Sequence, residues 1–356
     1  MPSLLLPLFA LAMLSGAPAT AHGADRTATA VDALMRDYEG DVPGASVLVL
    51  KDGEPLLRRG YGLADLDSGA AATPAMNYRL ASVTKQFTAA SILLLAEDGK
   101  LSLDDPVKRW LPSLPAAADT VTLRQLLSHT SGLVDYEEHI PEGFAGQLHD
   151  ADVLRILEGQ DHTYFTPGSD YRYSNSGYAL LALVAGRASG KDFASFLHER
   201  IFQPLHMDAT VAHQDGVDTV ARRAYGYSLV DGGWQRTDQS QTSAVLGDGG
   251  IYSSIDDLAR WDAALYDDRL FPARVRTLMF SPATTTGEPD VPHYGFGWRL
   301  NGDSVWHSGE SIGFRNVIVR WPAEHLTVVV LTNRNDPEPY RLALAIARLY
   351  RAPAAP

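Results

Sequence analysis

The spacing of apolar residues changes twice along the chain. Residues 31–39 repeat apolar positions at helical spacing, and residues 45–62 form two strand-like runs around Asp52-Gly53, a pair typical of a tight hairpin turn. Between residues 100 and 275 the pattern is mainly helical and is broken by Pro and Gly. Short β-rich runs follow at tight spacing, and "EPYRLALAIARLYR" closes the chain as a predicted helix.

These elements predict an α+β fold, in which strands from both ends of the chain share one antiparallel sheet. Residues 31–99 and 276–350 would form this sheet lobe, with the terminal helices covering it. Residues 100–275 would form a mainly helical lobe, and the active site would lie in the cleft between the lobes. We expect residues 22–350 to be a single catalytic unit and residues 351–356 to be a frayed tail.

The N-terminus has the pattern of an export signal. An apolar run over residues 4–14 is followed by small residues that end in Ala-Thr-Ala at residues 19–21. We expect residues 1–21 to be a signal peptide and the protein to be periplasmic or secreted; an uncleaved N-terminal anchor is the alternative. No later stretch approaches the 18 apolar residues of a membrane span, so we expect no stable membrane anchor.

Composition excludes several classes of function. The chain of 356 residues has no cysteine, which rules out disulfides, a cysteine nucleophile and thiolate metal sites. Its net charge of −13 disfavours nucleic acid as a partner. None of its eleven histidines stands in a metal-binding pattern, so we expect no metal and no cofactor, and His129 is interpreted as structural. The expected partner is a small molecule or short peptide, such as a cell-wall peptide.

Ser82-Val83-Thr84-Lys85 is the first candidate for chemistry. On a helix, residues three apart are neighbours, so Lys85 can take the proton of the Ser82 hydroxyl if its own amine is neutral. Only Lys85 among the five lysines has a serine three positions before it. The predicted helix from Ser82 ends at a Gly99 cap, with Val83, Phe87, Ala90 and Leu94 on one face. The alternative is that Ser82 merely caps this helix.

Tyr173-Ser174-Asn175 is the second candidate, in a loop just before a predicted helix. Tyr173 would carry protons, and Asn175 would hold a substrate amide or the Lys85 amine. The alternative is a helix cap formed by Ser174 or Asn175, with Tyr173 packing beside it.

His307-Ser308-Gly309 is the third candidate, on or at the end of a strand. A substrate could bind along this strand through backbone hydrogen bonds, and the N–H of Glu310 would hold an oxyanion together with that of Ser82. The same stretch spells G-x-S-x-G around Ser311, the nucleophile elbow of α/β-hydrolases. That motif requires a following helix, whereas "FRNVIVRW" predicts a strand, so Ser311 is not the expected nucleophile.

In this order, the S-x-x-K, Y-x-N and H-x-G motifs resemble the serine β-lactamase and penicillin-binding enzyme superfamily. The chain is most similar to the branch of class C β-lactamases, D,D-carboxypeptidases, D-aminopeptidases and esterases, from about residue 31 to 350. "LLSHTSGL", "GGIYSSIDDLARW" and "LTVVVLTN" extend the resemblance. It implies an acyl-enzyme on Ser82, with Lys85 and Tyr173 as proton carriers and Tyr173 activating the hydrolytic water. A non-catalytic penicillin-binding or sensor domain is the alternative of another class.

Two departures from the resemblance bear on the substrate. The β-lactamases of this branch have Lys-Thr-Gly where this chain has His307, which is largely neutral at pH 7. Aligned on its prolines, "NRNDPEPYR" keeps Arg341 but has Glu338 in place of an Asn near the substrate carboxylate. Both changes favour a peptidase or esterase over a class C-like β-lactamase, unless Glu338 simply faces solvent.

Overall fold

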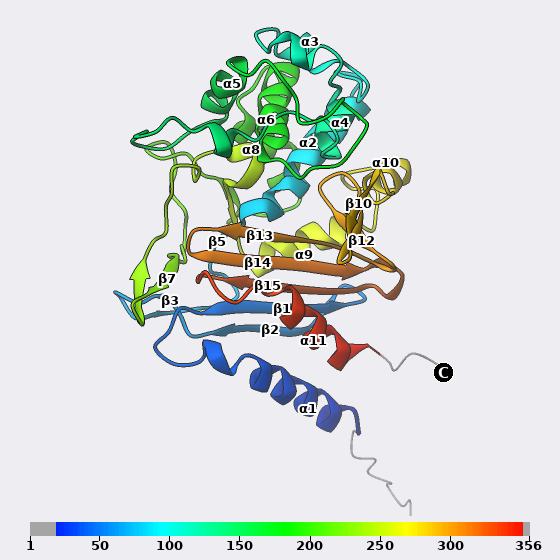
Figure 1. Cartoon of the computed structure of the whole chain (residues 1–356). Helices are drawn as coiled ribbons and strands as arrows, with labels where there is room; N and C mark the ends of the chain where they lie inside the picture. The colour runs from blue at the N-terminus through cyan, green and yellow to red at the C-terminus, as the bar shows by residue number, and fades with distance from the viewer. Residues whose placement is uncertain (1–18, 352–356) are drawn as a thin grey trace, which may run out of the picture.

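The computed structural model describes residues 19–351. Eight strands form one antiparallel sheet in the order β10-β11-β12-β13-β14-β15-β1-β2, so N-terminal and C-terminal segments share the sheet and meet where β15 pairs with β1 (Figure 1). The strands are β1 (Ala45–Lys51), β2 (Glu54–Tyr61), β10 (Thr284–Glu288), β11 (Val291–Tyr294), β12 (Arg299–Asn301), β13 (Ser304–Ser311), β14 (Phe314–Trp321) and β15 (Leu326–Thr332). The predicted α+β fold with a shared sheet is confirmed.

Both faces of the sheet are covered, which explains why its central strands are almost continuously apolar. Val47 and Val49 of β1 pack with α1 (Ala19–Leu34) and α11 (Tyr340–Tyr350) on one face. Leu48 and Leu50 point to the opposite face, toward α9 (Ile255–Ala264) and the helical lobe. The helix predicted over residues 31–39 differs: α1 ends at Leu34, and a 3₁₀ turn, η1 (Arg36–Tyr38), follows.

The predicted hairpin between β1 and β2 is present, with Asp52 and Gly53 both at positive φ as a tight hairpin turn requires. The predicted signal peptide lies outside the described residues apart from residues 19–21, which begin α1. Of the predicted tail, only Arg351 is described. Within residues 19–351, no helix is both long and apolar enough to cross a membrane.

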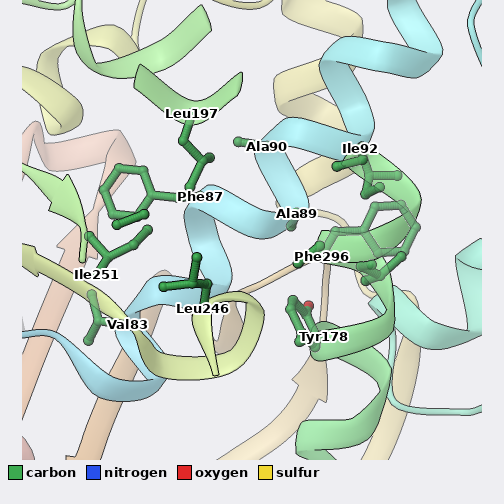
Figure 2. Packing of buried hydrophobic residues seen from close by; sticks show 14 of the residues in the cluster. Val83, Phe87, Ala89, Ala90, Ile92, Tyr178, Leu197, Leu246, Ile251 and Phe296 are labelled. Atoms are coloured by element: carbon green, nitrogen blue, oxygen red, sulfur yellow. The ribbon is translucent and has the colours of Figure 1, made fainter. Parts of the chain in front are cut away.

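The helical lobe is built around α2 (Lys85–Glu97), which is buried on all sides from Lys85 to Leu95. The four residues predicted to share an apolar face are buried, and the other faces of α2 are buried as well because the helix lies inside the lobe and not on its surface. Figure 2 shows Phe87 of α2 packed near Leu197, Ile251 and Leu246, and Ala89 near Tyr178 and Phe296. The surrounding helices are α3 (Val107–Trp110), α4 (Leu123–Leu127), α5 (Asp150–Glu158), α6 (Asn175–Ser189), α7 (Phe193–Leu197), α8 (Leu246–Gly249) and α10 (Ala273–Met279).

Short strands and turns join the two lobes. A three-stranded ribbon combines β5 (Tyr78–Arg79), β9 (Ile251–Ser253) and β6 (Val211–Ala212), and it leads directly into the turn that carries Ser82. The remaining short strands are β3 (Leu63–Asp65), β4 (Ala70–Ala71), β7 (Tyr227–Val230) and β8 (Gly233–Arg236). The remaining 3₁₀ turns are η3 (Ala116–Ala118), η4 (Tyr136–His139) and η6 (Pro322–Glu324), and η5 (His198–Phe202) is a short π-helix after α7.

Candidate active site

Ser82 lies in a 3₁₀ turn, η2 (Ala81–Thr84), between β5 and α2, and not on α2 itself as the sequence predicted. Ala81 directly before it has a φ of +50°, a left-handed conformation that is unfavourable for a residue with a side chain. The N–H of Leu80 donates to the carbonyl of Ile251 at 2.8 Å, which ties the turn to β9. The sharp bend at Ala81 thus places Ser82 just before the N-terminal end of α2 and beside β13.

Lys85 is fully buried and donates three hydrogen bonds. Its Nζ lies 3.1 Å from Ser82 Oγ, 2.7 Å from Asn175 Oδ1 and 3.0 Å from the carbonyl oxygen of Asp248. Three acceptors match the three protons of an ammonium group. The structure therefore brings Ser82, Lys85 and Asn175 into one connected group, as their predicted roles require.

The Tyr173 ring lies next to this group. Lys85 Nζ lies 5.0 Å from the centroid of the Tyr173 ring. The Tyr173 hydroxyl is buried and has no hydrogen-bond partner among the described residues. Ser174 is the N-cap of α6 but makes no capping hydrogen bond through its side chain, so helix capping alone does not explain this stretch.

Strand β13 runs past Ser82 with a free edge. Its neighbour β12 pairs with it only over Ser304–Trp306, so the edge from His307 to Ser311 has no strand beside it within the described residues. At Gly309 an added Cβ would lie 2.0 Å from the Leu80 carbonyl oxygen and 3.2 Å from Ser82 N. Only glycine allows so close an approach, which places the backbone before Glu310 beside Ser82.

Two hollows meet at Ser82. The narrow hollow is lined by Tyr136, Glu137, Asn175, Thr242, Ser243, Asp248, Glu310 and Ser311, among others. The wide hollow has a volume of about 600 Å³ and is lined by residues that include Glu137, Tyr173, Asn175, Arg299, Ser308, Glu310, Glu338 and Arg341. Ser82 is common to both, so it lies where the two halves of a substrate would join.

His307 does not line either hollow, which differs from its predicted role in substrate binding. It is fully buried, with Nε2 3.0 Å from the Tyr294 hydroxyl and Nδ1 2.6 Å from the Ser308 carbonyl. Because side chains alternate along a strand, His307 lies on the same face of β13 as Gly309, the face that packs on η2. Burial, followed by the charges of Arg299 and Lys85, holds the pKa of His307 well below its ordinary value.

Arg299, which the sequence analysis missed, supplies a positive charge in the wide hollow. Its Nη1 donates to Ser308 Oγ at 2.9 Å, and its guanidinium lies 5.6 Å from the Tyr173 ring centroid. Arg299 on β12 pairs with Trp306 on β13, next to the H-x-G motif. No local sequence signal marks it, because the contact depends on the register of two strands.

The narrow hollow carries acidic groups that the sequence analysis also missed. Glu137 Oε1 accepts a hydrogen bond from Asn175 Nδ2 at 3.0 Å. Loss of hydration and the nearby Asp135 raise the pKa of the Glu137 carboxyl. Asp248 accepts from the Tyr136 hydroxyl at 2.8 Å, and burial raises the pKa of its carboxyl well above the ordinary value, against the opposing effect of Lys85.

Glu338 and Arg341 lie at the outer wall of the wide hollow. Glu338 Oε2 accepts the backbone N–H of Tyr340 at 2.9 Å, which caps the start of α11. Arg341 forms an ion pair with Asp290 at 2.5 Å and remains 70% exposed. Glu310 likewise points outward and pairs with Arg315 at 2.7 Å, so its contribution to the centre is its backbone.

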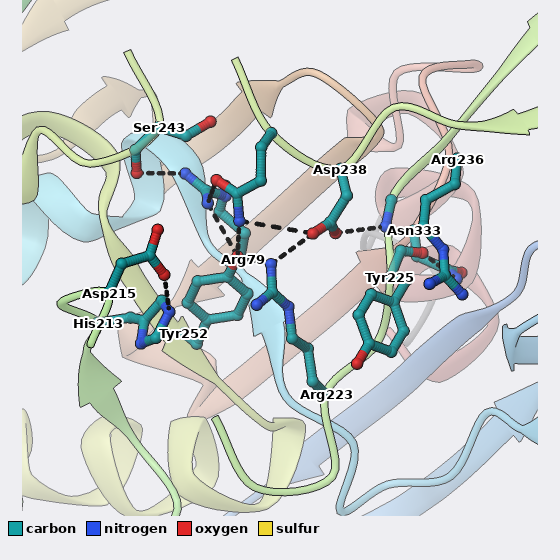
Figure 3. A network of polar contacts seen from close by, with 12 residues as sticks. Arg79, His213, Asp215, Arg223, Tyr225, Arg236, Asp238, Ser243, Tyr252 and Asn333 are labelled. Atoms are coloured by element: carbon teal, nitrogen blue, oxygen red, sulfur yellow. Dashed lines mark hydrogen bonds and ion pairs between the residues drawn. The ribbon is translucent and has the colours of Figure 1, made fainter. Parts of the chain in front are cut away.

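A buried polar network supports the wall of the narrow hollow (Figure 3). Arg79, three residues before Ser82, donates to Gln239 Oε1 and to the Tyr252 hydroxyl, each at 2.8 Å, and to the carbonyl of Ser243. Arg223 binds the same Tyr252 hydroxyl at 3.0 Å. This network fixes the segment with Ser243 against β5 and β9. Within residues 19–351 no group of histidines and carboxylates is arranged to hold a metal ion.

Comparison with known proteins shows similarity to penicillin-binding proteins. The chain is 31% identical over 318 residues to penicillin-binding protein 4* of Bacillus subtilis (strain 168), covering 84% of this chain and 70% of that protein. It is also 31% identical to protein flp of Staphylococcus aureus (strain MRSA252) over 84% of this chain but only 61% of the relative. The chain therefore spans about two thirds of the length of these relatives.

Solved structures of related proteins have a similar fold. A penicillin-binding protein homologue from Pyrococcus abyssi superposes with a TM-score of 0.79 at 26% identity, over 92% of this chain and 77% of the other. D-amino acid amidase from Ochrobactrum anthropi SV3 does so with a TM-score of 0.79 at 25% identity, over 92% and 100%. The family model described as Beta-lactamase matches residues 27–352. The chain therefore belongs to the beta-lactamase family, whose relatives include hydrolases.

Proposed function

We propose that the protein is an exported serine hydrolase that forms an acyl-enzyme with the amide or ester carbonyl of a short peptide-like substrate. It would be of the D,D-carboxypeptidase, D-aminopeptidase or esterase type. The observation that carries this proposal is the 3.1 Å contact between Lys85 Nζ and Ser82 Oγ. That distance lies within the range for proton transfer from a nucleophile to its base.

The reaction begins when Ser82 Oγ attacks the substrate carbonyl carbon and its proton passes to the Lys85–Tyr173 pair. Lys85 is surrounded by acceptors that fit an ammonium group, so it has to lose one proton before it can act as a base. Tyr173, whose hydroxyl has no hydrogen-bond partner within residues 19–351, is the group to relay that proton. The N–H groups of Ser82 and Glu310 stabilise the oxyanion, and water later releases the acyl group.

We use the position of Tyr173 to propose which hollow binds the leaving group and which binds the acyl group. The leaving group needs a proton, and Tyr173 lines the wide hollow but not the narrow one. The leaving group therefore occupies the wide hollow and the acyl group the narrow one. Arg299 then faces the leaving group and Asp248 faces the acyl group, whereas Glu137 lines both hollows beside Ser82.

This distribution of charge favours a short peptide with free ends. A carboxylate on the leaving group would pair with Arg299, and a free amine on the acyl group would pair with Glu137. The similarity to a D-amino acid amidase supports an acyl group of this kind. We therefore expect dipeptides and amino-acid amides, tested in both the D and L series, to be better substrates than blocked peptides.

The first test is intact-protein mass spectrometry after mixing with benzylpenicillin and, separately, with a fluorophosphonate. We expect a covalent adduct on the wild-type protein and none on Ser82→Ala. An adduct that persists on Ser82→Ala would refute Ser82 as the nucleophile. A wild-type protein that reacts with neither compound and hydrolyses no ester or peptide would refute the proposed function.

The second test compares a free dipeptide with its N-acetylated and C-amidated forms. Arg299→Gln should abolish the preference for a free carboxylate and leave the preference for a free amine. Glu137→Gln should do the reverse. Arg341→Gln serves as the matched control, because Arg341 is already paired with Asp290 at the outer wall. If Arg299→Gln and Arg341→Gln have equal effects, the assignment of the leaving-group side is wrong.

A class C-like β-lactamase is the second candidate, and Arg299 is the observation that favours it. The sequence argued against this activity because His307 supplies no positive charge, but Arg299 stands beside Ser308 instead. The benzylpenicillin experiment separates the candidates: steady loss of drug without a lasting adduct indicates a β-lactamase, and a lasting adduct indicates a peptidase-type enzyme. Export is tested by sequencing the N-terminus of the mature protein, which we expect to begin at His22.

A further inference from the structure

His129, which the sequence analysis interpreted as structural, holds the backbone on both sides of Tyr173. Its carbonyl oxygen accepts the N–H of Arg172 at 3.0 Å. Its Nδ1 accepts the N–H of Ser174 at 3.2 Å. One residue thus holds the backbone N–H groups of Arg172 and Ser174, the two neighbours of Tyr173 in the chain.

The His129 ring also packs against the Tyr173 ring. The two ring centroids are 4.3 Å apart with an angle of 34° between the planes. Tyr178 lies against His129 at 5.0 Å, and Tyr294 meets it edge-on at 4.6 Å. Since the Tyr173 hydroxyl has no hydrogen-bond partner among the described residues, backbone contacts and ring packing determine where it points.

The protonation state of His129 suits this contact. Its Nδ1 accepts a hydrogen bond and therefore carries no proton, which places the single ring proton on Nε2. Burial, together with the charges of Lys85 and Arg299, holds the pKa of His129 well below its ordinary value. A charged imidazole would lose the bond to Ser174 and would place a second cation beside Lys85.

The backbone at His129 is specialised as well. It has a φ of +58°, directly after α4, and its side chain is 2% exposed. Left-handed backbone geometry at a buried residue is costly and persists where the surroundings enforce it. Here it turns both the carbonyl and the ring of the same residue toward Tyr173.

We propose that His129 is a positioning residue that fixes Tyr173 for proton transfer to and from Lys85 and the leaving group. This inference rests on the proposed function, because it assigns Tyr173 a role in the reaction. His129 lines neither hollow, so the reacting group that it contacts is Tyr173.

Two substitutions separate the contacts. His129→Ala removes the Nδ1 acceptor and the ring. His129→Asn keeps an acceptor, because Asn Oδ1 lies close to the position of Nδ1, and Asn tolerates positive φ. We expect His129→Ala to lower kcat/KM about 100-fold, the effect of a small displacement of a reacting group, and His129→Asn to recover about 10-fold of that loss.

His325 provides a matched control. It also has a left-handed φ, of +48°, and it also stacks on a tyrosine, Tyr266, at 4.5 Å. It lies in the turn between β14 and β15, at the opposite end of β14 from Phe314 and the Ser82 edge. We expect His325→Ala to leave kcat/KM within about twofold of the wild-type value, because His325 lies far from Tyr173 and distant sites act independently.

The decisive experiment is a double-mutant cycle with Tyr173→Phe. If His129 acts through Tyr173, His129→Ala should cost less than about threefold in the Tyr173→Phe background. The readouts are kcat/KM on a hydrolysed substrate and the rate at which a fluorophosphonate modifies Ser82, which needs no natural substrate. Equal losses in both backgrounds, or a wild-type rate in His129→Ala, would overturn the inference.

Folding is monitored by thermal melting of every variant. If His129→Ala does not fold, His129→Gln replaces it, because its amide lies one bond farther out and cannot accept from Ser174 in the same place. Gln as active as Asn would then contradict the inference. A wild-type protein that fails to react with the fluorophosphonate and with every substrate rejects the proposed function itself, and the role of His129 with it.

Discussion

Replacing Gly309 with Ala tests the close contact between β13 and the turn that carries Ser82. The new Cβ would lie 2.0 Å from the Leu80 carbonyl oxygen, so strand and turn must separate by about 1.4 Å to reach ordinary van der Waals contact. The atoms next to the new Cβ belong to the backbone of Leu80 and Ser82, so no flexible side chain can move aside. The separation moves the N–H of Glu310 away from that of Ser82, and these are the two proposed oxyanion donors.

A displacement of about 1 Å in a reacting geometry costs on the order of 100-fold in rate. Overpacking at a buried site costs about 1–3 kcal/mol of stability. We therefore expect Gly309→Ala to fold with a lower melting temperature and to lose at least about 100-fold in the rate of Ser82 acylation. The loss is steric, because Gly309 does not have a positive φ.

The assay is the rate of fluorophosphonate labelling and of ester hydrolysis, measured at a temperature where circular dichroism shows the variant folded. Gly233→Ala on β8 is the control, because its Cβ would meet only the Val230 carbonyl, at 3.8 Å. A Gly309→Ala protein with wild-type acylation would show that β13 can move without consequence, and it would refute the assignment of Glu310 as an oxyanion donor.

Three further substitutions test other parts of the structure. Ala81→Gly should raise the unfolding free energy by about 1 kcal/mol in urea titration, because glycine tolerates the left-handed φ. Asp262→Ala should cost about 3–5 kcal/mol, because it leaves Arg320 charged and buried beside α9. Burial raises the pKa of Asp150 from 3.8 to about 6, so its ionisation opposes folding. The protonated carboxyl therefore stabilises the fold by about 3 kcal/mol below pH 4, and this contribution is lost as the pH rises through 6. Asp150→Asn should make the unfolding free energy less dependent on pH over this range.

The sequence predicted those parts of the site that depend on local spacing. Ser82 and Lys85 are three positions apart, and either a helix or a 3₁₀ turn brings their side chains together, so the error about η2 did not affect the contact. Lys85 and Asn175 lie 90 positions apart, and their 2.7 Å contact was one of two roles predicted for Asn175, between which the sequence spacing could not decide. Periodicity likewise predicted the shared sheet but not the complete burial of α2.

The parts that the sequence missed depend on register between distant segments. Glu137 faces the narrow hollow because η4 packs against the start of α6, where Asp135 accepts the N–H of Asn175 at 2.7 Å. His307 was predicted to face the substrate from its place in a motif, whereas the alternation along β13 turns it inward. In both cases the side-chain direction follows from packing that no short window of sequence contains.

The comparison of His307 with Arg299 shows why the charge of a site cannot be inferred from one motif position. A histidine at this point is largely neutral at pH 7 and does not supply the fixed positive charge that would recruit a carboxylate. Instead, His307 is buried and neutral. The positive charge comes from Arg299 on the neighbouring strand β12, which donates a hydrogen bond to Ser308 Oγ. A positively charged residue at position 307 would lie among Tyr294, Tyr173 and His129 and near Lys85, where it would oppose the uptake of the Ser82 proton by the Lys85 amine. Placing the cation on β12 therefore separates substrate recruitment from the proton chemistry at Lys85.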